Sequence, residues 1–272
     1  MGTIAKLAVA PSGWPTALQI EKDTVNEAEP QYEALPETLP TLRGLPERIT
    51  EDARSALRDL QTRLVAFQLK YQFALDQLET KINILREEFE HTHEYSPIEH
   101  VRTRLKSMDS LLAKIERTNC PRDLDSVGER IRDIAGVRIT CSFVADAYWI
   151  ADMLTSQPDV TVAEVKDYIV EPKPNGYQSL HLIVQVPVYL SDRTELVYVE
   201  VQIRTIAMDF WASLEHKIYY KYEGEIPAGL RDELRQAAIV ADHLDRTMAR
   251  LHDEVSHLDG RHDVVRHQRR RD

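Results

Sequence analysis

Three segments with the character of β-strands follow one another in the middle of the chain, and the links between them are short. They cover residues 160–170, 180–190 and 196–203, and turn-forming residues separate them. Neighbouring parallel strands need a crossover of about a dozen residues or more, whereas antiparallel strands need only a turn. The sequence therefore argues against a doubly wound parallel fold and predicts an antiparallel or mixed sheet.

Helical patterns on both sides of these strands predict an α+β fold. Apolar residues recur at helical spacing from 51 to 90, after an N-cap-like Thr50. Ser96-Pro97 is typical of a helix start, and we expect that helix to run from 98 to 117. The other expected elements are a strand over 137–143 and helices over 145–156, 207–222 and 229–258. The result is a mixed, mostly antiparallel sheet flanked by helices, with long helices at both ends.

Two of the expected strands have one apolar and one polar face, because successive side chains of a strand point to opposite sides. The polar faces carry Tyr198, Glu200 and Gln202 in one strand, and Arg138, Thr140 and Ser142 in the other. Asp133 stands just before the second of these strands, where a loop carboxylate can point into a cleft. An ordinary half-exposed sheet would show the same alternation.

Cations follow one stripe of the helix expected over 98–117. Lys106, Ser110 and Lys114 stand at i, i+4 and i+8, and Arg117 is nearby. Like charges at this spacing are unfavourable in an isolated helix. A bound polyphosphate would relieve the repulsion, and a solvated basic face is the alternative interpretation.

A glycine-centred turn ahead of the strand over 180–190 presents Tyr177 for stacking and His181 for hydrogen bonding, although a buried aromatic would explain it equally well. Asp133 and Glu200 can hold Mg²⁺, which prefers oxygen ligands and substrate phosphates. Lysine and arginine neutralise charge that develops on a transferred phosphoryl group. The residues thus indicate metal-dependent transfer from a nucleoside triphosphate, and they leave the acceptor open.

Composition limits the compartment and the partners. The 272 residues are 43% hydrophobic and 29% charged, as in globular proteins, and the net charge of −11 argues against a duplex-DNA binder. Cys120 and Cys141 supply no disulfide framework. No stretch approaches the roughly 18 apolar residues of a membrane span. We therefore expect a cytoplasmic protein without membrane contact.

Five strings along the chain carry a more specific signal. They are Tyr95-Ser-Pro-Ile-Glu-His-Val-Arg-Thr-Arg-Leu-Lys, Asp133-Ile-Ala-Gly-Val-Arg-Ile, Lys173-Pro-Asn-Gly-Tyr-Gln-Ser-Leu-His, Glu200-Val-Gln-Ile-Arg-Thr and Ala207-Met-Asp-Phe-Trp-Ala-Ser-Leu-Glu-His-Lys. In this order they resemble the synthetase domain of RelA/SpoT-type enzymes, most closely the small, single-domain members. The resemblance implies a nucleotidyltransferase-like sheet and a GTP diphosphokinase of the stringent response. Such an enzyme transfers the β,γ-pyrophosphate of ATP to the 3′-oxygen of GTP, GDP or GMP, which yields the alarmone (p)ppGpp and AMP.

The same resemblance implies a role for each matching residue. Asp133 would bind Mg²⁺, and Glu200 would assist the metal or draw the proton from the 3′-hydroxyl. ATP would be bound by Arg104, Lys106, Ser110, Lys114, Arg117 and Arg138, with the two outermost arginines of this set, Arg104 and Arg138, on either face of adenine. The guanosine nucleotide would be bound by Lys173, Tyr177, His181, Gln202 and Asp209. Tyr177 would stack on guanine, and the carboxylate of Asp209 suits the donor groups of the guanine edge.

The domain layout expected from these patterns has three parts. Residues 1–46 are a proline-rich arm, expected to be disordered; residues 47–258 are the synthetase domain; and residues 259–272 are a basic tail. Small members of the family form homotetramers through their terminal helices, and the long helices here suit that assembly. Two alternatives stay open: a regulator of the same fold that binds nucleotides or single-stranded RNA with little catalysis, and an enzyme that transfers NMP and releases pyrophosphate.

Overall fold

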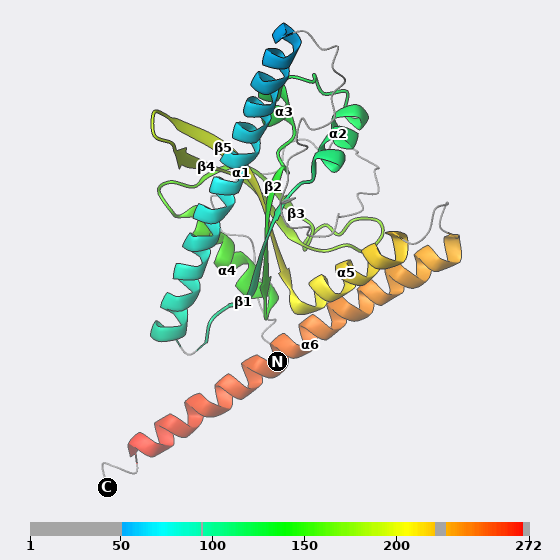
Figure 1. The fold of residues 1–272 in the computed structure, drawn as a ribbon. Helices are drawn as coiled ribbons and strands as arrows, with labels where there is room; N and C mark the ends of the chain where they lie inside the picture. The colour runs from blue at the N-terminus through cyan, green and yellow to red at the C-terminus, as the bar shows by residue number, and fades with distance from the viewer. Residues whose placement is uncertain (1–50, 94, 221–226, 269–272) are drawn as a thin grey trace.

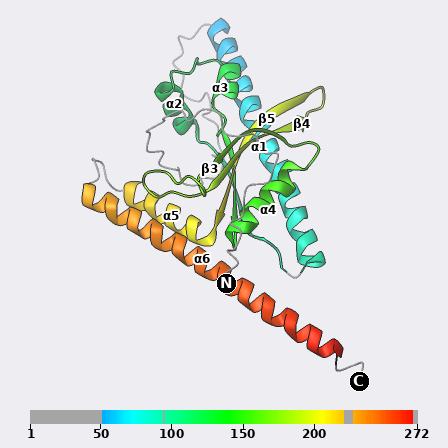
Figure 2. The same ribbon diagram turned by 180° about the vertical axis from the view of Figure 1, so that it is seen from behind.

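The computed structural model describes residues 51–93, 95–220 and 227–268, and shows helices around one central sheet (Figures 1 and 2). In chain order the elements are α1 (Glu51–Thr92), β1 (Ile98–Leu105), α2 (Met108–Arg117), α3 (Leu124–Arg130), β2 (Ala135–Cys141), α4 (Val144–Thr155), β3 (Thr161–Asp167), β4 (Leu180–Tyr189), β5 (Thr194–Thr205), α5 (Ile206–Tyr220) and α6 (Ala228–Gln268).

The five strands form one sheet in the order β1-β2-β5-β4-β3. β2 and β5 run parallel, and the three other neighbouring pairs are antiparallel. The predicted α+β fold with a mixed, mostly antiparallel sheet is thereby confirmed. The parallel pair places Gly136 opposite Glu200 and Arg138 opposite Gln202, so the polar faces of two strands far apart in sequence lie side by side.

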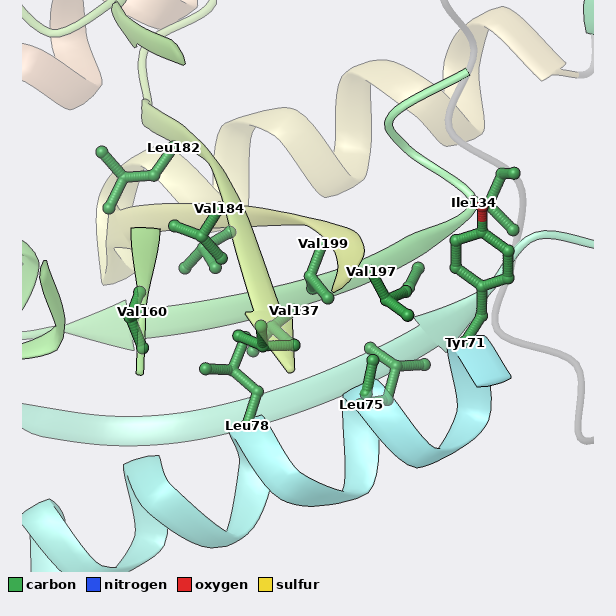
Figure 3. Packing of buried hydrophobic residues seen from close by; sticks show 14 of the residues in the cluster. Tyr71, Leu75, Leu78, Ile134, Val137, Val160, Leu182, Val184, Val197 and Val199 are labelled. Carbon is green, nitrogen blue, oxygen red and sulfur yellow. The ribbon is translucent and has the colours of Figure 1, made fainter. Parts of the chain in front are cut away.

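The apolar face of the sheet is packed against α1 and α4. Tyr71, Leu75 and Leu78 of α1 point toward the strands (Figure 3), and α4 contributes Ile150 and Leu154 to the same buried cluster. The strand residues that meet them include Val137, Val197 and Val199. Because burial of one such side chain contributes roughly 1.5–3 kcal/mol, this contact anchors α1 along the sheet. The long first helix expected from the sequence is present.

The prediction of one helix over residues 98–117 is wrong. The first part of that segment is β1, which pairs antiparallel with β2 and places Arg104 opposite Gly136. A helix begins only after Ser107, whose extended backbone and side-chain oxygen cap α2 by accepting a hydrogen bond from the backbone N–H of Ser110 at 3.3 Å. Lys106 therefore lies before the helix and does not share a helical stripe with Ser110 and Lys114.

A second, smaller apolar cluster joins α5, α6 and the turn before β4. Tyr177 of the turn packs there with Trp211 and Ala212 of α5 and Ala238 of α6. Beyond this contact, α6 projects away from the body of the molecule in both views (Figures 1 and 2). The predicted end of the domain at residue 258 falls inside α6. The arm predicted over 1–46 and the last four residues of the predicted tail lie outside the described residues.

Candidate functional site on the polar face of the sheet

Two rows of polar side chains cross the face of the sheet that does not meet α1. The strand register puts Arg104, Gly136 and Glu200 in one row, and Arg102, Arg138, Gln202 and His181 in the next. A hollow on this face is lined by Arg104, Gly136, Val137, Arg138, Glu200 and Gln202. The structure thus brings five of the predicted site residues to one face, two of them assigned to ATP, one to catalysis and two to the acceptor.

Gly136 keeps this hollow open. A Cβ atom at this position would meet only the backbone oxygens of Glu200 and Arg104, at 3.8 and 3.9 Å, which is ordinary van der Waals contact. The backbone of the strand therefore does not require glycine. Its lack of a side chain instead leaves room on the polar face between the arginines and the carboxylate.

Asp133 lies at the centre of a buried charge cluster just before β2. The ammonium groups of Lys106 and Lys114 each donate a hydrogen bond of 2.8 Å to its Oδ2 atom. Burial raises the pKa of Asp133, but the two ammonium groups outweigh that effect and bring the pKa to about 2. Burial and the neighbouring cations lower the pKa of Lys106, against the effect of Asp133. With both lysines protonated, the cluster holds two positive charges and one negative charge, which favours an anionic ligand.

The second oxygen of Asp133 is suited to a metal ion. Its Oδ1 atom is buried, and within the described part of the chain it has no hydrogen-bond partner. A buried carboxylate oxygen normally has a partner. No group of three or more histidine, cysteine or acidic side chains gathers as a metal site among the described residues. Mg²⁺ commonly takes one or two carboxylates and completes its shell with water and substrate phosphates. The residues present fit that mode of binding.

Glu200 belongs to a closed circuit of hydrogen bonds with four other side chains. Its Oε1 atom lies 3.3 Å from Nδ1 of His181, and Nε2 of His181 lies 2.7 Å from the hydroxyl of Tyr177. Arg204 donates to that hydroxyl and, at 3.0 Å, to Oε1 of Gln202. Gln202 closes the circuit by donating to Oε2 of Glu200 at 3.0 Å. Burial raises the pKa of Glu200, but the hydrogen bond and charge of His181 outweigh it, so the pKa is lowered and the carboxylate is ionised at neutral pH.

Tyr177 is held by its surroundings on several sides. Its side chain is buried in the cluster with Trp211 and Ala238, with the whole residue only 9% exposed. The ammonium of Lys173 lies 5.0 Å from the centre of the Tyr177 ring. Gly176, in the same turn, has a φ of +94°, and a Cβ atom there would lie 2.5 Å from Cβ of Ala238. The turn therefore fits closely against α6.

Asp209, in the first turn of α5, connects two arginines of the sheet. Its Oδ1 atom lies 3.3 Å from Nη1 of Arg138 and 3.3 Å from Nη1 of Arg204. Arg204 was not among the residues singled out from the sequence. The signal was present nonetheless, because Arg204 continues the polar alternation of Glu200 and Gln202 by one more step along β5.

The two remaining predicted residues are on α2. Ser110 lies in the first turn, where the hydroxyl of Ser107 donates a hydrogen bond of 2.8 Å to its side-chain oxygen. Arg117 lies in the last turn and is exposed. A helix N-terminus beside lysine side chains is favourable for phosphate groups, and α2 begins two residues after Lys106.

The fold and this arrangement of charges define an α+β domain with a mixed sheet whose polar face carries clustered cations and carboxylates. Residues 103–225 match the family described as the region found in RelA / SpoT proteins. The chain is 48% identical over 205 residues to GTP pyrophosphokinase YwaC of Bacillus subtilis strain 168, and the match covers 75% of this chain and 96% of YwaC. The chain therefore belongs to the RelA/SpoT family, which confirms the resemblance carried by the five strings.

Solved structures of small alarmone synthetases share the fold. Small alarmone synthetase 1 of B. subtilis bound to its product pppGpp is 39% identical, with a TM-score of 0.67 over 71% of this chain and 98% of that chain. The same protein bound to AMPCPP is 36% identical, with a TM-score of 0.62 over 72% of this chain and 99% of that chain. These ligands are a guanosine alarmone and an analogue of ATP.

None of the described helices is both long enough and apolar enough to span a membrane. The two cysteines, Cys120 and Cys141, are buried and free.

Proposed function

We propose that this protein is a GTP pyrophosphokinase that transfers the β,γ-pyrophosphate of ATP to the ribose 3′-oxygen of GTP, GDP or GMP. The products are the alarmone (p)ppGpp and AMP. The observation that carries this proposal is the Asp133 carboxylate held by Lys106 and Lys114, directly before the strand whose polar face joins that of Glu200. The family membership and the nucleotide ligands of the related structures support it.

The reaction needs a base for the acceptor and charge neutralisation for the donor. Glu200, ionised at neutral pH, accepts the proton of the 3′-hydroxyl. The 3′-oxygen then forms a bond to the β-phosphorus of ATP, and the bond from the β-phosphorus to the α,β-bridging oxygen breaks, so that AMP leaves. Lys106 and Lys114 neutralise the charge that spreads over the transferred phosphoryl oxygens.

On the donor side, the hollow that Arg104 and Arg138 line would take the adenine base, because guanidinium planes stack well on aromatic rings. The ATP phosphates would lie toward Lys106, Ser110, Lys114 and Arg117. Asp133 and Glu200 would hold Mg²⁺. When bound, this ion neutralises phosphate oxygens and orients the phosphate chain.

On the acceptor side, the guanosine nucleotide would contact Lys173, Tyr177, His181, Gln202 and Asp209. In the structure Tyr177 packs against α6 and Asp209 pairs with two arginines. We infer that the packing of Tyr177 against α6 rearranges when the acceptor binds, since stacking on guanine needs a ring face.

We also infer a homotetramer that forms through the terminal helices. Its support is a row of exposed apolar residues along α6 at helical spacing, namely Val240, Leu244, Met248, Leu251 and Val255. Binding of single-stranded RNA by the basic tail stays a prediction, because the side chains of residues 256–272 are outside the described part of the chain. Of the alternative regulator with little catalysis, only the RNA-binding form depends on that tail.

The test is a reaction of the purified protein with Mg²⁺, γ-labelled ATP and, separately, GMP, GDP and GTP. We expect label in a more phosphorylated guanosine nucleotide, with AMP in equal amount, and the relative rates rank the acceptors. Release of free pyrophosphate in place of AMP would instead identify NMP transfer. Nucleotide binding without any transfer would favour the regulator.

A further inference from the structure

Arg204 is a charged side chain that is wholly buried, with an exposed fraction of 0%. A buried charge is strongly unfavourable unless partners compensate it. The contacts of the Arg204 side chain therefore indicate its role. Its guanidinium donates to Oδ1 of Asp209 at 3.3 Å, to Oε1 of Gln202 at 3.0 Å and to the hydroxyl of Tyr177. Its central carbon also lies 5.0 Å from the centre of the Tyr177 ring.

These three partners come from three separate parts of the fold. Gln202 is on β5, Tyr177 is in the turn before β4, and Asp209 is on α5. All three belong to the set assigned above to the guanosine nucleotide. One planar guanidinium therefore contacts three groups from three parts of the fold at once. The fork of N–H donors makes this possible, and the single ammonium of lysine cannot reproduce it.

Arg204 also connects the acceptor set to the hollow. Asp209 is shared by Arg204 and Arg138, so two guanidinium groups meet on one carboxylate. Arg138 and Gln202, which both belong to this network, line the hollow on the polar face together with Glu200.

We propose that Arg204 is a positioning residue for the acceptor nucleotide, which holds Tyr177, Gln202 and Asp209 in the geometry that binds guanosine phosphates. The proposal rests on the proposed function. Because Arg204 contacts residues of the acceptor set, loss of its guanidinium fork should weaken binding of the guanosine nucleotide far more than binding of ATP. A residue with a merely structural role would affect both substrates alike through loss of folded protein.

The test compares Arg204→Lys with the wild type in two measurements. Steady-state rates give the KM for GTP and for ATP, and calorimetric titration with GDP in the absence of ATP gives acceptor affinity without turnover. A charged hydrogen bond is worth about tenfold or more in binding, so we expect Arg204→Lys to raise the KM for GTP and the Kd for GDP by about tenfold. The KM for ATP should stay within about twofold of the wild type.

Two further variants keep the test decisive. Asp245→Asn is the matched control, because Asp245 is also buried and accepts a 2.6 Å hydrogen bond from Thr205, the neighbour of Arg204, but touches none of the acceptor residues in the described contacts. It should change stability and leave the ratio of the two KM values unchanged. Tyr177→Phe keeps the ring and removes the hydroxyl that Arg204 and His181 both contact; it should raise the Kd for GDP, and its effect should not add fully to that of Arg204→Lys. If Arg204→Lys does not fold, Tyr177→Phe decides alone.

The outcomes separate this proposal from the proposed function. A wild type that binds GDP but transfers nothing refutes the pyrophosphokinase activity, and the GDP titrations still decide the role of Arg204. Unchanged GDP affinity in folded Arg204→Lys, or equal increases in both KM values, would overturn the positioning role. A wild type that binds no guanosine nucleotide overturns both.

Discussion

Nδ1 of His181 and Oε1 of Glu200 lie 3.3 Å apart, on the adjacent antiparallel strands β4 and β5. Through its hydrogen bond and charge, His181 lowers the pKa of Glu200 against the opposing effect of burial. This contact orients the carboxylate on the polar face and keeps it unprotonated. A carboxylate that serves as a general base needs both properties.

The first prediction follows from this contact. Replacement of His181 by Ala removes the largest of the effects that lower the pKa of Glu200, so that pKa rises and the acidic limb of the kcat–pH profile moves to higher pH. At neutral pH kcat should fall by about tenfold to a hundredfold, less than the roughly 10²–10⁴-fold that a general acid–base group contributes, because Glu200 itself remains. His100→Ala, at an exposed histidine of β1, is the control and should leave the profile unchanged. An acidic limb that stays in place would show that His181 does not tune Glu200.

The second prediction concerns the hollow at Gly136. Gly136→Val should fold, because the added Cβ meets only backbone oxygens at 3.8 and 3.9 Å, but its methyl groups occupy the space proposed for adenine. We expect the KM for ATP to rise by about tenfold or more, as for a loss of roughly 1.4 kcal/mol of binding, with a small change in Tm. Gly136→Ala should have a weaker effect. Gly229→Val is the matched control, since nothing lies within 4 Å of a Cβ at Gly229. An unchanged KM for ATP in Gly136→Val would place adenine elsewhere.

The third prediction concerns the close fit of the turn against α6. Gly176→Ala forces a Cβ to within 2.5 Å of Ala238 and strains a backbone with φ of +94°. It should lower the free energy of unfolding by about 1–3 kcal/mol. In the wild type Ala238→Gly should cost about 1 kcal/mol through helix propensity. In the Gly176→Ala background the same change should cost less or stabilise, because it relieves the clash. Additive effects in denaturant unfolding of the four proteins would show that the two residues do not meet.

The fourth prediction is a pH dependence of stability from Asp245. Burial raises the pKa of Asp245 to about 6, against the hydrogen bond from Thr205, which lowers it. Between about pH 4 and pH 6 the folded protein keeps a proton that the unfolded chain has released, so stability falls as pH rises through this window. The loss is about 3 kcal/mol for a shift of roughly two pKa units.

Asp245→Asn tests that dependence directly. An amide oxygen can still accept the hydrogen bond from Thr205, and it carries no charge. In urea unfolding the variant should match the wild type near pH 4 and exceed it above pH 6.5, whereas Asp232→Asn, at an exposed position of α6, should follow the wild type throughout. Equal slopes for Asp245→Asn and the wild type between pH 4 and 6 would contradict the assignment.

Much of the fold follows from local sequence pattern. The wrong prediction of a helix over residues 98–117 shows where local pattern is insufficient. The alternation of Val197, Val199 and Val201 specified both the strand and its buried face. In contrast, the segment from Ile98 to Leu105 has apolar residues at a spacing that also suits a helix. Its strand state depends on pairing with β2, a contact more than thirty residues away in the register Arg104 to Gly136. Such tertiary context outweighs intrinsic propensity.

The site shows the same limit. The sequence indicated Asp133 and Lys114 as separate features, and the resemblance assigned both to the site. Their 2.8 Å contact depends on how the start of β2 approaches α2, which no local pattern records. The polar alternation along β5 could have indicated Arg204. Its role depends on Tyr177, in the turn before β4, and on Asp209 of α5, which the alternation does not show. The contact of Gly176 with Ala238 likewise required the position of α6.

The most direct test of the central claim is transfer by variants that remove one carboxylate at a time. Asp133→Asn and Glu200→Gln should retain the wild-type circular dichroism spectrum and yield neither AMP nor labelled guanosine nucleotide from γ-labelled ATP and GTP, while the wild type yields the two in equal amounts. Wild-type turnover in either variant would contradict the account, because the reaction would then not depend on the carboxylates of this face of the sheet.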